Sequence, residues 1–294
     1  MAVRRRERET WTYSGDGAAA AFSPDDWSTR NISADDLRVV FQPIVALDAG
    51  SLFAAEALVR CRLPAFDSPE RLFEAAEVEH ACGRLGRVIR ELAFAQAPDV
   101  PLFVNLHPQE LSSRWLVRPD DPMNFHQQTV YLEVTESAAF DHFDLVMSTL
   151  KEVCSRNDAR LVVDDFGAGY SNLKRVAELE PAIVKLDREL VRGLHQSQRQ
   201  QALVGYVVRL CNALGARVVA EGIETPGELR AARDCGVDYG QGFLLARPGN
   251  PMPLPSFPLE PTARYSRRPS IESRMSAAPR SRRSSRPRRF PIKR

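Results

Sequence analysis

The stretch LRVVFQPIVALDAGSLFAAEALVR, from Leu37 to Arg60, decides how the fold begins. It contains two apolar runs, residues 37–47 and 51–60, and only Asp48, Ala49 and Gly50 separate them. A parallel pair of strands needs a crossover of a dozen or more residues, whereas a turn this short joins antiparallel strands. One of these two strands is therefore predicted to run antiparallel.

Six more short apolar runs follow, and longer amphipathic stretches separate most of them. The runs are PLFVNLHP (101–108), TVYLEVTE (129–136), RLVVDDFG (160–167), AIVKLD (182–187), ARVVAEGIE (216–224) and GQGFLLARP (240–248). The helix-like stretches are residues 68–97, 141–156, 171–179, 196–214 and 225–234. Strands that alternate with helices in this way predict an α/β fold, a TIM (β/α)8 barrel modified by one antiparallel strand near the N-terminus. The alternative is an open doubly wound sheet, but the chain lacks a glycine-rich phosphate loop between a strand and a helix.

The charge of the chain divides it into an acidic body and a basic tail. The net charge is only +2, but residues 264–294 contain twelve Lys and Arg and one acid, so the rest is acidic. We expect a flexible segment over residues 1–30, one globular domain over 31–256, and a disordered tail rich in Arg, Ser and Pro over 257–294. The tail is either an inert solvated segment or a site for an anionic membrane or nucleic acid, because clustered arginines bind polyanions.

The cysteines and the N-terminus bear on the compartment and on the kind of metal. The five cysteines are far apart and form no C-x-x-C pair, which argues against a zinc site and against a disulfide framework. Residues 1–10 are rich in Arg and Glu with no apolar segment behind them, so they do not resemble a secretory signal. We therefore expect a cytoplasmic protein whose metal ligands, if any, are oxygen atoms.

Carboxylates and carboxamides recur at the ends of the predicted strands. The carboxyl ends of barrel strands meet on one face, where loops form the active site. Arg60 and Lys185 are too few to neutralise so many acids, and hard divalent cations such as Mg²⁺ or Mn²⁺ would do so. Each acid alone is more often a helix cap or a solvated loop residue, so the prediction depends on the set. Its members are Glu56, Asn105, Glu133, Asp164, Asp165, Asp187, Glu221 and Glu224.

At this point the chain resembles the EAL domain family, which is named for the tripeptide Glu56-Ala57-Leu58. The tripeptide alone would be a trivial match, but seven further segments match in order over about residues 33–250. They are FQPIV, FVNLHP, LEVTES, DDFGAGYSNL, VKLD, AEGIET and QGFLLARP.

The resemblance implies a phosphodiesterase that converts the bacterial second messenger cyclic di-GMP into linear pGpG with two Mg²⁺ or Mn²⁺ ions. The residues that match the family's metal ligands are Glu56, Asn105, Glu133, Asp164, Asp165, Asp187 and Glu221. The catalytic residues it implies are Glu221 as general base or metal ligand, Lys185 for the nucleophilic water, and Glu56. The substrate-binding residues it implies are Arg60 at a phosphate, with Gln42, Gln241, Glu224 and Leu58. Glu136 matches a glutamate that supports the loop over residues 166–172, which in the family links metal binding to dimerisation, so a homodimer is a further expectation.

Two departures and one alternative function remain open. Cys61 stands where the family usually has tryptophan, and the segment between Arg60 and Asn105 lacks the usual glycine-proline turn. We expect these differences to change substrate affinity more than chemistry. The alternative function is a catalytically silent receptor for cyclic di-GMP, although such relatives have lost metal ligands or the catalytic glutamate, which this chain retains.

Overall fold

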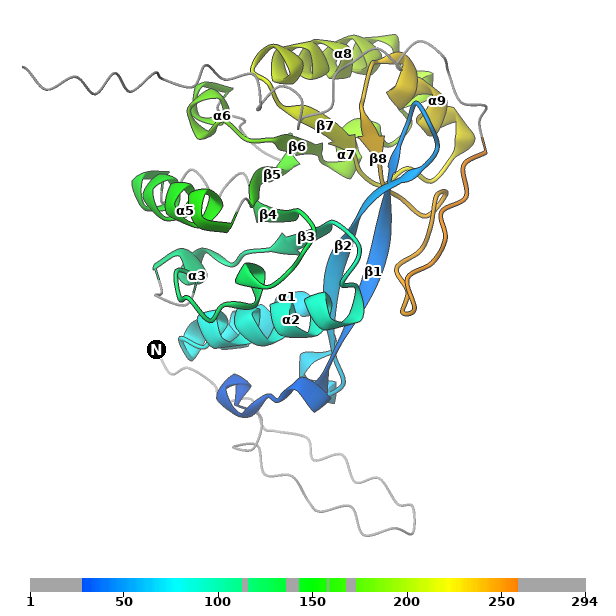
Figure 1. The fold of residues 1–294 in the computed structure, drawn as a ribbon. Helices are drawn as coiled ribbons and strands as arrows, with labels where there is room; N and C mark the ends of the chain where they lie inside the picture. The colour runs from blue at the N-terminus through cyan, green and yellow to red at the C-terminus, as the bar shows by residue number, and fades with distance from the viewer. Residues whose placement is uncertain (1–27, 113–115, 136–142, 158, 168–172, 259–294) are drawn as a thin grey trace, which may run out of the picture.

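Eight strands close into a barrel in the order β1 to β8 in the computed structural model of the chain, which describes residues 28–112, 116–135, 143–157, 159–167 and 173–258 (Figure 1). β1 (Leu37–Ala46) runs antiparallel to both of its neighbours, β2 (Leu52–Cys61) and β8 (Tyr239–Gly240). All other neighbouring strands are parallel. The remaining strands are β3 (Leu102–Asn105), β4 (Val130–Thr135), β5 (Arg160–Phe166), β6 (Ile183–Leu186) and β7 (Arg217–Ala220). The prediction of a modified TIM barrel is confirmed, and β1 is the antiparallel strand.

The helices lie outside the strands and bury their apolar faces against them (Figure 1). Local signals fix several helix starts: the Ser68 hydroxyl accepts a bond from the backbone N–H of Arg71, and Thr225 and Glu228 form a capping box. The helices of the described residues are α1 (Pro69–Val78), α2 (Cys82–Gln96), α3 (Pro108–Ser112), α5 (Phe143–Asn157), α6 (Leu173–Leu179), α7 (Arg188–Val191), α8 (Gln198–Ala213) and α9 (Pro226–Asp234).

Two predicted elements differ from the structure. The stretch 68–97 is two helices rather than one, because His80 adopts a left-handed backbone with φ of 55° and ends the first helix. The predicted strand over 240–248 was wrong beyond Gly240. The chain turns there because the N–H groups of Leu245 and Ala246 bond to the carbonyl of Gly242, whose backbone lies directly against Ile223.

The two ends of the described barrel domain are held by specific contacts. Ser28 and Thr29 donate side-chain hydrogen bonds to the Glu79 carboxylate, at 2.7 and 2.8 Å. At the other end, the ring of Phe257 lies against Gly50. Of the predicted flexible segment 1–30 and the predicted tail 257–294, residues 1–27 and 259–294 lie outside the described residues, and the domain boundaries stay predictions. No helix among the described residues is both long and apolar enough to cross a membrane.

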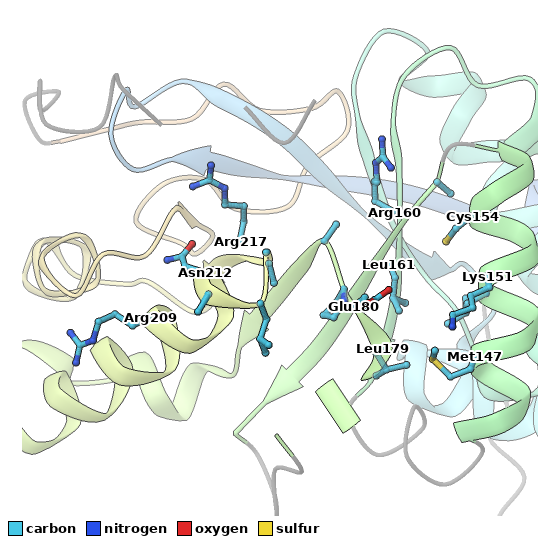
Figure 2. Close-up of a pocket in the computed structure, with 18 residues that line it drawn as sticks. Met147, Lys151, Cys154, Arg160, Leu161, Leu179, Glu180, Arg209, Asn212 and Arg217 are labelled. Atoms are coloured by element: carbon cyan, nitrogen blue, oxygen red, sulfur yellow. The ribbon is translucent and has the colours of Figure 1, made fainter. Parts of the chain in front are cut away.

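A hollow of about 890 Å³ opens between α5 and α8 at the amino ends of β5, β6 and β7 (Figure 2). Its lining is mostly apolar and includes Met147, Leu161 and Leu179, with Lys151 and Arg217 among its basic residues. This hollow lies at the opposite end of these strands from Asp164, Lys185 and Glu221. It is therefore separate from the carboxylate-rich face that the sequence singled out.

Candidate active site

Seven of the predicted site residues and the predicted lysine form one layer inside the barrel: Gln42, Glu56, Asn105, Glu133, Asp164, Glu221 and Gln241, with Lys185. A layer of mainly apolar residues from every strand fills the barrel interior, and side chains two residues apart on a strand point to the same side. On each strand, the next side chain on the same face is polar. It lies two residues after the apolar residue in β2 to β8, and two residues before it in the antiparallel strand β1. The pairs are Ile44 and Gln42, Ala54 and Glu56, Phe103 and Asn105, Tyr131 and Glu133, Val162 and Asp164, Ile183 and Lys185, Val219 and Glu221, and Tyr239 and Gln241. The apolar layer is thus the floor of a polar site.

Lys185 lies at the centre of this layer and is 1% exposed. Its ammonium nitrogen is 2.6 Å from Oε1 of Glu133, 2.7 Å from Oε1 of Glu221, 3.2 Å from Oδ1 of Asp164 and 3.7 Å from Oε2 of Glu56. The prediction that this lysine is buried is confirmed. One ammonium group therefore faces four carboxylates from four different strands.

The electrostatics follow from this imbalance between one cation and four acids. Burial alone would lower the pKa of Lys185, but the surrounding carboxylates raise it well above its usual value. Burial raises the pKa of Glu221 to about 8, and it raises the pKa of Glu133 and of Asp165 as well. Burial also opposes ionisation of Glu56, but Lys185 and the amide donors around it bring its pKa below the usual value. The site therefore keeps a protonated lysine and a shortage of positive charge.

Gln241 and Asn105 hold the Glu56 carboxylate in place, and Gln42 in turn contacts Gln241. Nε2 of Gln241 donates to Oε2 of Glu56 at 2.6 Å, and Nδ2 of Asn105 donates to Oε1 of Glu56 at 3.1 Å. Nε2 of Gln241 also lies 3.0 Å from Oε1 of Gln42, whose own amide donates to the carbonyl of Ala246. This chain of amides connects the antiparallel strand β1 to the first carboxylate of the site.

Asp164, Asp165 and Glu221 form a cluster in which one carboxylate oxygen of each lies within 4.8 Å of the others. Asp165 has a left-handed backbone with φ of 56°, and the register between β5 and β6 shifts between Val163 and Phe166. A non-glycine residue in this conformation is strained, and such strain is concentrated at functional sites. The irregularity brings two successive aspartates to the same opening of the barrel.

The donor set fits hard divalent cations. Oε2 of Glu133 is buried and has no hydrogen-bond partner among the described residues, and the same holds for Oε1 of Gln241. Buried polar atoms are nearly always satisfied, so unpaired oxygens beside a carboxylate cluster indicate a missing partner of positive charge. Carboxylate and amide oxygens are the ligands that Mg²⁺ and Mn²⁺ prefer. The residues present therefore fit such ions.

A pocket of about 710 Å³ adjoins the polar layer on the side of β2 and β3. Glu56, Asn105 and Asp165 line it, together with Leu58 and Arg60. The guanidinium of Arg60 donates to the carbonyl of Val59 at 2.7 Å and makes no other hydrogen bond within the described part of the chain. The pocket places an arginine and an apolar wall next to the carboxylates.

The sequence reasoning missed part of this pocket. His107 lines it and stacks on Phe73, with 5.6 Å between ring centroids and 4° between planes. Thr135 also lines it, two residues beyond Glu133. The period-two spacing from Asn105 to His107 and from Glu133 to Thr135 was the available signal, because it places these side chains above the polar layer.

Three predicted residues do not join the carboxylate layer. Asp187 caps α7 by accepting the N–H of Glu189 at 2.8 Å, although its charge is near enough to contribute to the raised pKa of Asp165. The side chain of Glu224 is exposed. Glu136 lies outside the described residues, as does the loop over 168–172.

The comparisons with known proteins identify the family. The profile of the EAL domain family matches residues 25–248, which is most of the chain. The chain belongs to the EAL domain family.

Two curated relatives match this chain over part of their own length. The cyclic di-GMP phosphodiesterase RocR of Pseudomonas aeruginosa is 30% identical over 232 residues, which are 74% of this chain and 59% of RocR. The cyclic di-GMP phosphodiesterase PdeR of Escherichia coli is 31% identical over 241 residues, which are 76% of this chain and 35% of PdeR. This chain thus spans between about a third and three fifths of the length of these relatives.

Solved structures of a protein in complex with cyclic di-GMP have the same fold. BlrP1 of Klebsiella pneumoniae, in complexes with cyclic di-GMP and calcium or manganese, superimposes with TM-scores of 0.63 and 0.64 at 34% identity. The match covers 73% of this chain and 56% of BlrP1.

The EAL tripeptide of this chain lies in the middle of β2, so Glu56 is not a strand-end residue as the sequence suggested.

Proposed function

We propose that this EAL domain hydrolyses cyclic di-GMP to linear pGpG with two bound Mg²⁺ or Mn²⁺ ions. The observation that supports this most is the buried layer of four carboxylates around Lys185, which opens into a pocket that also holds Arg60. A receptor that only binds the nucleotide would not need so much uncompensated negative charge. The relatives named as cyclic di-GMP phosphodiesterases support the same reaction.

The proposed ion ligands follow the donor positions in the barrel. One ion would be held by Glu56, Asn105, Glu133 and Asp164, and the other by Asp164 and Asp165 with help from Asp187. Glu221 would serve as a ligand or as the base. When bound, the ions would supply positive charge for the phosphodiester and would lower the pKa of water, so that a hydroxide nucleophile forms near neutral pH.

The side chains have separate tasks in the proposed reaction. Arg60 donates paired hydrogen bonds to a phosphate, because a planar guanidinium matches two phosphate oxygens. Lys185 orients the attacking water, and Glu221 accepts its proton. The new P–O bond forms as the bond to the ribose oxygen breaks, and that oxygen leaves with a proton from solvent or from Glu221. Gln42, Gln241, Glu224 and Leu58 hold the substrate.

The direct test is incubation with cyclic di-GMP and Mn²⁺ or Mg²⁺, followed by chromatography. We expect linear pGpG with either ion and none in EDTA. Glu56→Gln and Glu221→Gln should each lower the rate at least about 100-fold, as expected for a lost acid–base or metal-binding group. Glu77→Gln, on the exposed face of α1, is the matched control and should keep the full rate. Tight binding of cyclic di-GMP without product would support the silent receptor instead.

Further proposals concern the compartment and the partners. We propose that the domain acts in the cytoplasm and as a homodimer, through the loop that includes residues 168–172. The basic tail over 257–294 is proposed to bind an anionic membrane or nucleic acid. A chain truncated after Pro258 should lose binding to anionic vesicles and to DNA, and unchanged binding would dismiss the tail as the cause.

A further inference from the structure

A buried ion cluster forms part of the wall of the pocket that adjoins the polar layer, because Arg90 is one of the residues that line it. Arg90 of α2 is 1% exposed, and its two terminal nitrogens contact Oε2 of Glu110 at 2.6 Å and Oδ2 of Asp121 at 3.0 Å. Both carboxylates are fully buried. None of the three belongs to the polar layer inside the barrel. We call Arg90, Glu110 and Asp121 the Arg90 cluster.

The cluster fixes the turn that follows Asn105. Oε1 of Glu110 accepts the backbone N–H of His107 at 3.1 Å, and the backbone N–H of Glu110 donates to the carbonyl of His107 at 2.8 Å. Glu110 therefore bonds to a turn that begins two residues after Asn105 and leads into α3. Leu106, which lies between Asn105 and His107, donates its backbone N–H to the carbonyl of Glu133 at 2.9 Å.

Gly86 of α2 packs directly against the Glu110 carboxylate. A Cβ atom on Gly86 would overlap the carboxylate of Glu110, so only glycine allows this approach of the helix. Gly86 and Arg90 lie four residues apart on the same face of α2, so the helix contacts Glu110 at two points. The position of α2 is thereby transmitted to the turn at His107.

Stability alone does not account for such a cluster. Burying ions costs free energy that their attraction only partly repays, and apolar residues of similar size are often equally stabilising. A buried cation whose two terminal nitrogens are each paired with a carboxylate does, however, fix geometry, because leaving one of these charges unpaired is costly. The cluster is thus suited to positioning rather than to added stability.

We propose that Arg90 and Glu110 are positioning residues for metal binding, and that they act through Asn105. This inference rests on the proposed function, in which Asn105 is a metal ligand. The cluster holds the turn after β3 so that the Asn105 carboxamide contacts Glu56. In the same way it holds His107 in the pocket wall.

The test is a double-mutant cycle on Mn²⁺ affinity, measured by electron paramagnetic resonance on the full chain. Glu110→Gln keeps an acceptor for the His107 N–H but removes the charge that pairs with Arg90. We expect it to weaken Mn²⁺ binding about 10- to 100-fold, the range for residues that orient metal ligands. Asn105→Ala should weaken it similarly, and the double variant should be no weaker than Asn105→Ala alone.

Two further variants separate positioning from folding. Arg90→Lys keeps a buried cation but loses the fork that contacts two acids, so it should fold and give an intermediate loss of Mn²⁺ affinity. Arg217→Met breaks the ion pair with Asp238 (2.7 Å) at the far end of the barrel, and it should lower stability without changing Mn²⁺ affinity. Excess Mn²⁺ should restore kcat in Glu110→Gln, which would not occur if the variant were simply unfolded.

The outcomes distinguish this inference from the proposed function. If Mn²⁺ affinity stays within twofold in both Glu110→Gln and Arg90→Lys, or if the losses of Glu110→Gln and Asn105→Ala multiply, the inference is wrong. If the natural chain binds Mn²⁺ but does not hydrolyse cyclic di-GMP, the proposed reaction fails while the affinity cycle still decides the role of the cluster. If the natural chain binds no Mn²⁺, both fail.

Discussion

At the scale of single residues, Lys185 is the side chain on which the site depends most. Four carboxylates from β2, β4, β5 and the end of β7 converge on its ammonium group. This ammonium group supplies the positive charge next to these carboxylates. In the proposed reaction it would also lie beside the reacting groups when the ions are bound, so it would have a second role.

Replacement of Lys185 by methionine should expose this dual role. Without the cation, the buried carboxylates lose their counter-charge, so the metal-free variant should be about 3–5 kcal/mol less stable, as for a broken buried ion pair. Mn²⁺ should recover part of the stability while hydrolysis stays at least about 100-fold slower. Urea unfolding in EDTA and in Mn²⁺ measures this, with Lys151→Met on the exposed face of α5 as the control. Equal stability of variant and natural chain in EDTA would contradict the prediction.

Metal binding should depend on pH because the site holds protons that ions must displace. Burial raises the pKa of Glu221 to about 8, so at neutral pH this acid is largely protonated without metal, and burial raises the pKa of Glu133 and of Asp165 in the same direction. Mn²⁺ affinity should therefore rise as the pH rises toward 8, by up to about tenfold per pH unit for each proton released. Calorimetry in two buffers of different ionisation enthalpy counts these protons. Affinity that is flat between pH 6 and 8 would show that the carboxylates are already ionised.

The chemistry of the residues could be predicted from sequence, but their mutual geometry could not. Carboxylates after apolar runs indicated a metal site, and Lys185 between Val184 and Leu186 indicated burial. The convergence on one ammonium depends on closure of the barrel, which brings Glu56 and Lys185 together across 129 positions of sequence. The strain at Asp165 also left no signal, because a shift of register depends on both strands.

At the scale of elements, the connection between α1 and α2 holds the start of the domain. Glu79, in this connection, accepts hydrogen bonds from Ser28 and Thr29, and the guanidinium of Arg30 donates to its backbone carbonyl at 2.7 Å. The sequence did not predict this break between helices, because Glu79-His80-Ala81 contains neither glycine nor proline. The left-handed His80 is instead imposed by packing of the two helices against the barrel.

Glu79→Ala should release the segment before β1 without disturbing the site. Loss of the two hydroxyl bonds and one backbone bond to the carboxylate should lower the free energy of unfolding by about 1–3 kcal/mol at pH 7. Burial opposes ionisation of this carboxyl, but its hydrogen bonds lower its pKa below 4.5, so its contribution is full above that pH and is lost as the pH falls below it. Urea unfolding at pH 7 and near pH 3 measures the difference, with the exposed Glu74→Ala as the control. A difference that grows at low pH would contradict the assignment.

The order and direction of the strands were the most predictable part of the elements. A three-residue turn predicted that one of the first two strands is antiparallel, which is β1 in the structure, and the alternation of strands and helices predicted the parallel remainder. The end of the barrel was less predictable, because the apolar run GQGFLLARP suits a strand until Gly242 must pass against the backbone of Ile223. That contact turns the chain back along β1, where Gly249 pairs with Phe41 (Figure 1).

At the scale of the whole molecule, the residues that fill the barrel core and the residues proposed to carry out the chemistry lie at different levels along the barrel axis. An apolar floor fills the barrel interior, and the polar layer lies directly above it on the same strands. The Arg90 cluster and the amide chain through Gln241 support this layer from outside and from β1. The arrangement explains how charged groups can be buried together, provided that cations complete the site.

The most direct test of this account is anomalous diffraction from a crystal grown with Mn²⁺ and cyclic di-GMP. We predict two manganese peaks in the polar layer, one beside Glu56, Asn105 and Glu133 and one beside Asp165, with a phosphate of the nucleotide next to them and to Arg60. A nucleotide bound in the pocket with no manganese in the layer would contradict the account, and so would manganese bound only elsewhere on the protein.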